Sequence, residues 1–139
     1  MTRVDPSEFA AVVPYIGLLG IEVDSAEPNE VRGRLPWAQE RCTAGGVMHG
    51  GALMSLADTI GAICAFLNLP DGTTTTTVES KTNFFRAVRD RHVAAVSRPL
   101  HVGGRFIVVQ TDLTDGDGRR VALVTQTQAV LTPRPEEAR

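Results

Sequence analysis

The sequence of 139 residues has little that would hold a metal ion or a disulfide framework. It contains two cysteines, Cys42 and Cys64, without a CxxC pair. Its three histidines, His49, His92 and His101, lie far apart and form no HxH or HxxxH pair. Structural metal sites depend on such close spacings, and a disulfide framework needs more than two cysteines. We therefore expect no metal site, and free thiols that suit a reducing compartment.

Excess charge and long apolar runs are also missing. The net charge is −2 and the basic residues are scattered, so nothing favours nucleic acid or an anionic membrane surface as a partner. No stretch approaches the roughly 18 uninterrupted apolar residues of a transmembrane helix. Residues 1–17 lack the basic start and apolar run of a signal peptide. We therefore expect a cytoplasmic protein.

The chain is long enough for one domain with its own hydrophobic core. Turn and cap residues divide it into predicted helices and strands. Its longest helical segment is apolar on most sides, so we expect a curved antiparallel sheet to wrap around it, which makes the fold class α+β. In order, the patterns predict a helix over 5–14 that Pro14 ends, two strands within 17–37 joined at Pro28-Asn29, a polar loop over 38–48, the long helix over 49–67, four strands within 73–131 with a hairpin at Gly116-Asp117-Gly118, and a flexible tail over 133–139.

The segment HGGALMSLADTIGA places one carboxylate, Asp58, in an otherwise apolar helix. At about 100° per residue, Asp58 lies about 180° from the centre of the stripe of large apolar side chains. A carboxylate there either points to water or faces a ligand, and periodicity alone favours neither. The stripe consists of Leu53, Leu56, Ile60, Ile63, Cys64 and Leu67, and Asp58 shares its side with Met54, Ser55, Gly61, Ala62 and Ala65.

The start of the same helix, His49-Gly50-Gly51, favours a ligand. Glycine lets a substrate oxygen approach the backbone N–H groups at a helix N-terminus, where the helix dipole favours negative charge. Gly50 and Asp58 are eight residues apart, or about 12 Å along the helix axis, so one carbonyl cannot contact both. If both serve one reaction, Gly50 of one subunit must meet Asp58 of another. The pair therefore predicts an obligate dimer with active sites at the interface.

The segments HGGALMSLAD, TVESKTNFFRAV and GGRFIVVQTDLTDGDGRRVALVT resemble the hotdog-fold acyl-CoA thioesterases, in particular the phenylacetyl-CoA (PaaI-like) type. The resemblance runs from about Gly17 to Leu131 and implies a single hotdog domain over 1–139, with a long helix wrapped by about six antiparallel strands. It implies homodimers joined through a continuous sheet, and often homotetramers. It also implies hydrolysis of acyl-CoA to free acid and CoA without a metal or a cofactor.

The resemblance assigns roles to residues by position. Asp58 matches the catalytic carboxylate, which acts as general base on water or as nucleophile. Gly50 matches the residue whose N–H polarises the thioester carbonyl, and His49 and Gly51 complete that turn beside the substrate. Thr77 falls where relatives place a hydroxyl that positions water, in a register that five consecutive threonines leave uncertain by a residue or two.

Further substrate contacts follow from the same resemblance. Thr43 stands where many relatives carry Asn or Gln near the thioester, and its hydroxyl has a shorter reach. Arg86 and Arg105 fall where relatives often place contacts to the CoA phosphates, although each also fits a solvated charge at a strand end. Met54 and Phe84 are candidates to line the acyl pocket, with a place in the core as the alternative.

Two other functions remain open on the same fold. One is a non-catalytic protein that binds or senses acyl-CoA, and the other is a hydratase or dehydratase of acyl thioesters. Hydrolysis fits better because Asp58 is present, no DNA-binding helix pair is attached, and His49 precedes the helix instead of facing the acid. No GxSxG motif is present, which argues against a serine hydrolase. The acyl group, the choice between dimer and tetramer, and the choice between nucleophile and base stay open.

Overall fold

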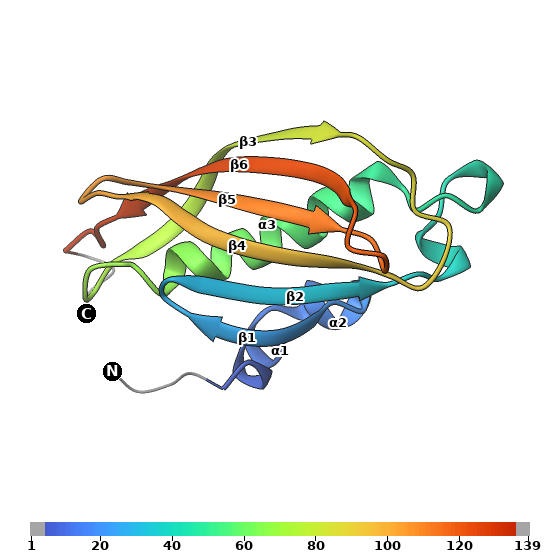
Figure 1. The fold of residues 1–139 in the computed structure, drawn as a ribbon. Helices are drawn as coiled ribbons and strands as arrows, with labels where there is room; N and C mark the ends of the chain where they lie inside the picture. Colours follow the sequence, from blue (N-terminus) through green and yellow to red (C-terminus); the bar gives the residue numbers. More distant parts are fainter. Residues whose placement is uncertain (1–4, 136–139) are drawn as a thin grey trace.

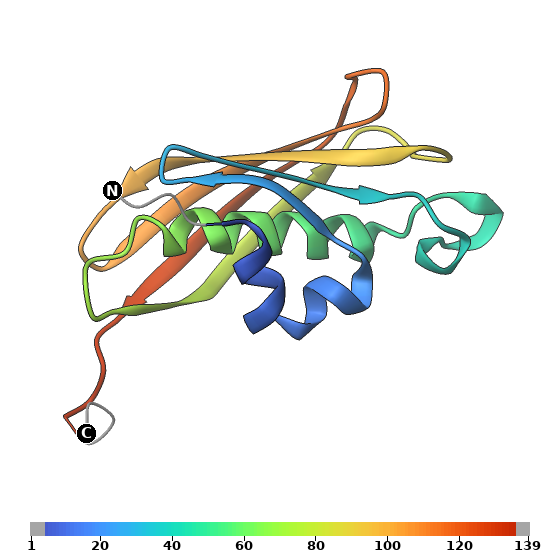
Figure 2. The same ribbon diagram turned by 90° about the horizontal axis from the view of Figure 1, so that it is seen from below.

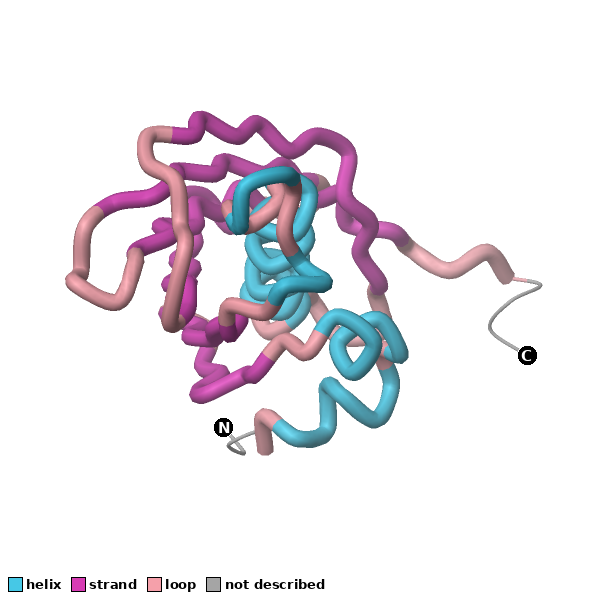
Figure 3. Tube along the Cα trace, turned by 90° about the vertical axis from the view of Figure 1, so that its right-hand side faces the viewer, coloured by secondary structure: helices cyan, strands magenta, loops and turns pink. Residues whose placement is uncertain are grey.

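One long helix, α3 (Gly50–Phe66), lies in the concave side of a six-stranded antiparallel sheet in the computed structural model, which describes residues 5–135 (Figure 1). The strand order is β1-β2-β4-β5-β6-β3. Seen towards the helix end, the strands arch around α3 (Figure 3). The other elements are α1 (Ser7–Val12), α2 (Pro14–Leu19), β1 (Glu22–Glu27), β2 (Glu30–Pro36), the 3-10 turns Gln39–Arg41 and Ala44–Gly46, β3 (Thr74–Phe84), β4 (His92–Val102), β5 (Phe106–Thr114) and β6 (Arg120–Leu131).

This architecture confirms the predicted α+β fold, the long helix and the six strands. Helices α1 and α2 lie on the side of α3 that the sheet leaves open (Figures 2 and 3). The ring of Phe9 meets that of Phe66 edge-on at 6.2 Å, and the hydroxyl of Tyr15 lies 2.9 Å from that of Ser55. Within the described residues, no helix is long and apolar enough to cross a membrane.

The N-terminal region differs from the sequence prediction in two ways. Pro14 does not simply end a helix over 5–14, because it also occupies the first turn of α2. Proline suits that position, since it fixes a helical φ and the N–H that it lacks has no partner there. Residues 17–19 are consequently helical, not part of a strand, and Gly20 ends α2 with a φ of 88°. The predicted tail over 133–139 falls largely outside the described residues.

The apolar stripe of α3 packs against the sheet as predicted, and Leu56, Ile60 and Cys64 are fully buried. Gly61 and Ala65, which share the side of Asp58 by helical periodicity, are nevertheless buried. The sheet curls further around the helix than helical periodicity reveals. The exposed side of α3 is therefore a narrow strip.

Strand β3 is one edge of the sheet and is largely exposed. Val78, at a bulge in the β3–β6 pairing, is 60% exposed, and Phe84 and Phe85 are 49% and 59% exposed. An exposed edge strand has unpaired backbone groups and tends to pair with another chain. This edge is therefore available for association.

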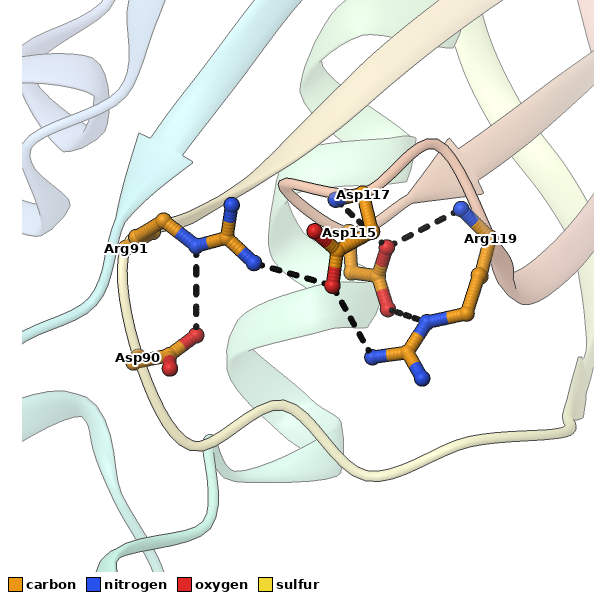
Figure 4. A network of polar contacts seen from close by, with 5 residues as sticks. All are labelled: Asp90, Arg91, Asp115, Asp117 and Arg119. Carbon is orange, nitrogen blue, oxygen red and sulfur yellow. Dashed lines mark hydrogen bonds and ion pairs between the residues drawn. The ribbon is translucent and has the colours of Figure 1, made fainter.

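Arginine–aspartate pairs hold the turn between β5 and β6 (Figure 4). Asp115 is buried and accepts hydrogen bonds at 2.9 Å from the backbone N–H groups of Asp117 and Arg119 and from Nε of Arg119. Arg91 pairs with Asp117 at 3.0 Å and with Asp90 at 3.6 Å. These guanidinium groups are balanced by carboxylates, so they stabilise the turn and are not free to bind an anion.

We expect Asp115→Asn to weaken the pH dependence of stability in acid. Burial raises the pKa of Asp115, but the N–H groups of Arg119 and Asp117 and the Arg119 guanidinium outweigh it, so the pKa lies below its usual value. A carboxyl group whose pKa is lower in the folded state stabilises the fold at pH values above its unfolded-state pKa of about 4. This stabilisation is lost as the pH falls through the folded-state pKa. Urea unfolding should show that the free energy of unfolding falls more between pH 7 and pH 3 in the wild type than in Asp115→Asn. Equal drops in both proteins would contradict this assignment.

Candidate active site

Asp58 lies on the exposed strip of α3, where the helix faces β3 and β6. Its Oδ1 accepts hydrogen bonds from Oγ1 of Thr77 at 2.9 Å and from Nε2 of Gln126 at 2.6 Å. Nε2 of Gln128 in turn donates to Oγ1 of Thr77 at 2.8 Å. Within residues 5–135, Oδ2 of Asp58 has no hydrogen-bond partner. The carboxylate is thus held by one oxygen and open at the other.

Two cavities meet at Asp58. The larger one has a volume of about 500 Å³ and lies between α1, α2 and α3, with predominantly apolar walls that include Phe9, Ile63 and Phe66. The smaller one, of about 230 Å³, runs along β3 past Met54. Ligand pockets in proteins commonly have the volume of the larger cavity and are mostly apolar with a few polar groups. The open oxygen of Asp58 therefore has room for a ligand beside it.

The start of α3 leaves one backbone donor free. His49 caps the helix, and its Nδ1 accepts the N–H of Gly51 at 2.8 Å. Within the described residues the N–H of Gly50 has no acceptor. The ring of Phe84 covers this position, since a Cβ built on Gly50 would lie 3.3 Å from its Cζ. An unpaired N–H at the positive end of a helix can bind an anionic or polarised oxygen.

The structure brings only some of the predicted site residues together. Thr77 joins Asp58, Met54 lines the smaller cavity, and Phe84 lies at Gly50. The side chain of Thr43 makes no hydrogen bond in the part of the chain that the structure describes, and it belongs to the loop that projects beyond the end of the sheet (Figure 1).

The two predicted phosphate contacts lie far apart in one chain. The backbone N–H of Arg86 donates to Val121 near one end of β6, and the carbonyl of Arg105 accepts from Val130 near the other end. Nine residues of strand separate these points, or about 30 Å. One protomer therefore cannot use both arginines on the same phosphate.

Sequence reasoning missed Gln126 and Gln128, both of which are fully buried. They alternate with Val124 and Val130 on the face of β6 that points to α3, and β6 has the period of two of a half-buried strand. Two amides at inward positions of a strand predict buried hydrogen bonds, because an unpaired buried amide is costly. This alternation was the signal that could have identified them.

The thiols are poor candidates for nucleophiles. Cys64 is fully buried, and this burial raises the pKa of its thiol to about 11, against the smaller lowering effect of Ser97. A thiol reacts as the thiolate, which is scarce here at neutral pH. Cys42 is half-buried and donates to the carbonyl of Ala38 at 3.3 Å. Among the described residues, no three His, Cys, Asp or Glu side chains gather into a group that could hold a metal ion.

Comparison with known proteins identifies the family. The profile of the thioesterase superfamily matches residues 45–122, more than half of the chain. The 1,4-dihydroxy-2-naphthoyl-CoA hydrolase of Escherichia coli is 28% identical over 84% of this chain and 85% of its own. A conserved protein from Pseudomonas aeruginosa is 38% identical, covers 84% of this chain and 93% of its own, and superposes with a TM-score of 0.79. A thioesterase from Haemophilus influenzae shares the fold with a TM-score of 0.88 at 24% identity, over 94% of this chain and 93% of its own. The chain therefore belongs to the thioesterase superfamily and is a thioester hydrolase with the hotdog fold.

Proposed function

We propose that this thioester hydrolase acts on acyl-CoA and releases the free acid and CoA. The observation that carries the proposal is the carboxylate of Asp58, which is held by Thr77 and Gln126 and opens onto an apolar cavity of about 500 Å³. The acyl group lies in this cavity with its carbonyl carbon beside the free carboxylate oxygen. The apolar walls favour an uncharged acyl group.

Hydrolysis at this site needs one base and one oxyanion donor. As a base, Asp58 takes a proton from water while the water oxygen attacks the carbonyl carbon. As a nucleophile, it forms a mixed anhydride that water then cleaves. In both schemes the C–S bond breaks and CoA leaves as a thiolate, which takes up a proton. A positioned base contributes about 10²–10⁴-fold and one oxyanion donor about 10²–10³-fold to the rate.

The oxyanion donor comes from a second subunit. Gly50 and Asp58 lie at points of one helix that are about 12 Å apart, so they cannot serve the same carbonyl. The exposed edge strand β3, with the exposed side chains of Val78 and Phe84, supports a homodimer in which Gly50 of the partner subunit faces Asp58. The same arrangement allows Arg86 of one subunit and Arg105 of the other to approach one CoA. The resemblance to hotdog thioesterases extends this proposal to a homotetramer.

A relative supports CoA as the carrier. The Escherichia coli protein is named as a hydrolase of an aromatic acyl-CoA, and it matches this chain over most of its length. We therefore place aromatic acyl groups first among the substrates. His49, Gly51 and Met54 complete the substrate contacts, and Thr43 takes the place of the Asn or Gln of many relatives.

The test is thiol release from benzoyl-, phenylacetyl-, hexanoyl- and palmitoyl-CoA by the wild-type protein. We expect at least one substrate to give a kcat/KM of about 10⁴ M⁻¹ s⁻¹ or more. Calorimetric binding without thiol release would instead identify an acyl-CoA sensor. A change in enoyl-CoA absorbance without thiol release would identify a hydratase, and either result would overturn the proposal.

A further inference from the structure

We propose that Gln126 is a positioning residue whose amide N–H holds Oδ1 of Asp58 and so leaves Oδ2 as the oxygen that reacts. This inference rests on the proposed function, because it concerns how the carboxylate is oriented for that reaction. It assigns a task to a buried side chain that lies behind the site and does not reach the substrate.

The two oxygens of Asp58 have different surroundings. Oδ1 receives two donors, Nε2 of Gln126 at 2.6 Å and Oγ1 of Thr77 at 2.9 Å, while Oδ2 receives none among the described residues. Hydrogen bonds to a carboxylate are about twice as strong as those between neutral groups, and they stabilise negative charge on the oxygen that accepts them. Oδ2 is therefore the more basic and more nucleophilic oxygen.

The orientation of the Gln126 amide is set by this contact. Gln126 is fully buried, and its Oε1 has no hydrogen-bond partner within residues 5–135. Turning the amide over would place Oε1 against the carboxylate, with lone pairs facing lone pairs. Leaving a buried amide oxygen unpaired costs about 1–3 kcal/mol, so this side chain is poorly explained as a purely structural one.

A second buried amide directs the hydroxyl of Thr77. Gln128 donates from Nε2 to Oγ1 of Thr77 at 2.8 Å, while its Oε1 faces the hydroxyl of Thr75 at 3.4 Å. A threonine hydroxyl carries a single proton. Because Gln128 is the donor in their contact, that proton is directed at Asp58. Oδ1 of Asp58 therefore receives one donor directly from Gln126 and a second from Thr77, whose proton Gln128 directs.

The backbone of α3 leaves space for this arrangement. A Cβ on Gly61 would overlap Oε1 of Gln126 and would lie 2.9 Å from its Cδ. Glycine at this helical position therefore leaves the space that the Gln126 amide occupies while it donates to Asp58.

The test compares Gln126→Met with wild type on the best substrate of the acyl-CoA panel. Methionine keeps the approximate volume and apolar fit of the stem but removes the donor. Losing a hydrogen bond to a charged group should lower kcat by about 10- to 100-fold, with KM changed less than about twofold. The matched control is Gln110→Met, a half-buried amide on β5 without a contact to Asp58, and it should keep the wild-type kcat.

A spectroscopic measurement tests the contact without substrate. In protein with ¹⁵N-labelled glutamine side chains, the amide resonance that disappears in Gln126→Met should shift in Asp58→Asn, and an unchanged resonance would overturn the inference. Wild-type activity with an undiminished kcat in Gln126→Met overturns the inference alone. Absence of thioesterase activity in the wild type overturns the proposed function and this inference with it. If Gln126→Met does not fold, Gln128→Met replaces it, with an expected fall in kcat of several-fold through Thr77.

Discussion

Replacing Asp58 with asparagine is expected to reduce thiol release by about 10²–10⁴-fold while the protein remains folded. Asparagine keeps the shape of the side chain, and its amide oxygen can still accept the hydrogen bonds of Thr77 and Gln126. The group at the place of Oδ2 becomes an NH₂, which can neither take a proton from water nor attack a carbonyl. The expected loss is therefore chemical and appears in kcat.

The stability of this variant should stay close to that of the wild type. Asp58 is exposed and makes no ion pair among the described residues, so its replacement leaves no buried charge unpaired. Thermal unfolding and size-exclusion chromatography check that the fold and the oligomeric state persist. The matched control is Asp71→Asn, an exposed carboxylate in the turn after α3. Undiminished turnover in Asp58→Asn would exclude this residue as base and as nucleophile.

The main elements of the fold could be predicted because their patterns are long. Helix α3 shows the helical period over its 17 residues, and the four strands that follow it are rich in β-branched residues and separated by turns. Helix α2 could not be predicted in the same way. Its sequence PYIGLL is a six-residue apolar run that suits a strand as well as a helix, and tertiary packing decides between them.

The sequence predicts a site residue only where an unusual residue type stands out within one local pattern. Asp58 and Gly50 stand out within a single helix, and Thr77 follows from the resemblance. The contact between Asp58 and Gln126 joins residues 68 positions apart, and it depends on how far the sheet curls around α3. No local sequence pattern predicts the curvature of the sheet, which is also why the burial of Gly61 was not predicted.

Gly61→Ala is expected to remove most of the activity at a modest cost in stability. Alanine is a better helix former than glycine by about 1 kcal/mol, which favours the variant. Against this, the new methyl group would overlap the Gln126 amide and lie 3.3 Å from Cγ2 of Val109. Crowding in a packed core costs about 1–3 kcal/mol, so crowding outweighs helix propensity and the free energy of unfolding should fall by about 0–2 kcal/mol.

The larger effect of Gly61→Ala is on the orientation of the Asp58 carboxylate. Gln126 has no solvent to turn into, so it must rotate within the core and give up its hydrogen bond to Asp58, which should lower kcat at least about 10-fold. The control is Gly17→Ala on α2, where a Cβ meets nothing within 4 Å, and it should keep full activity. In the double variant Gly61→Ala/Gln126→Ala the overlap is gone and the higher helix propensity of alanine remains. Its stability should therefore exceed that of Gln126→Ala, while kcat stays as low as in that single variant. A Gly61→Ala enzyme with wild-type kcat would mean that Asp58 is oriented without Gln126.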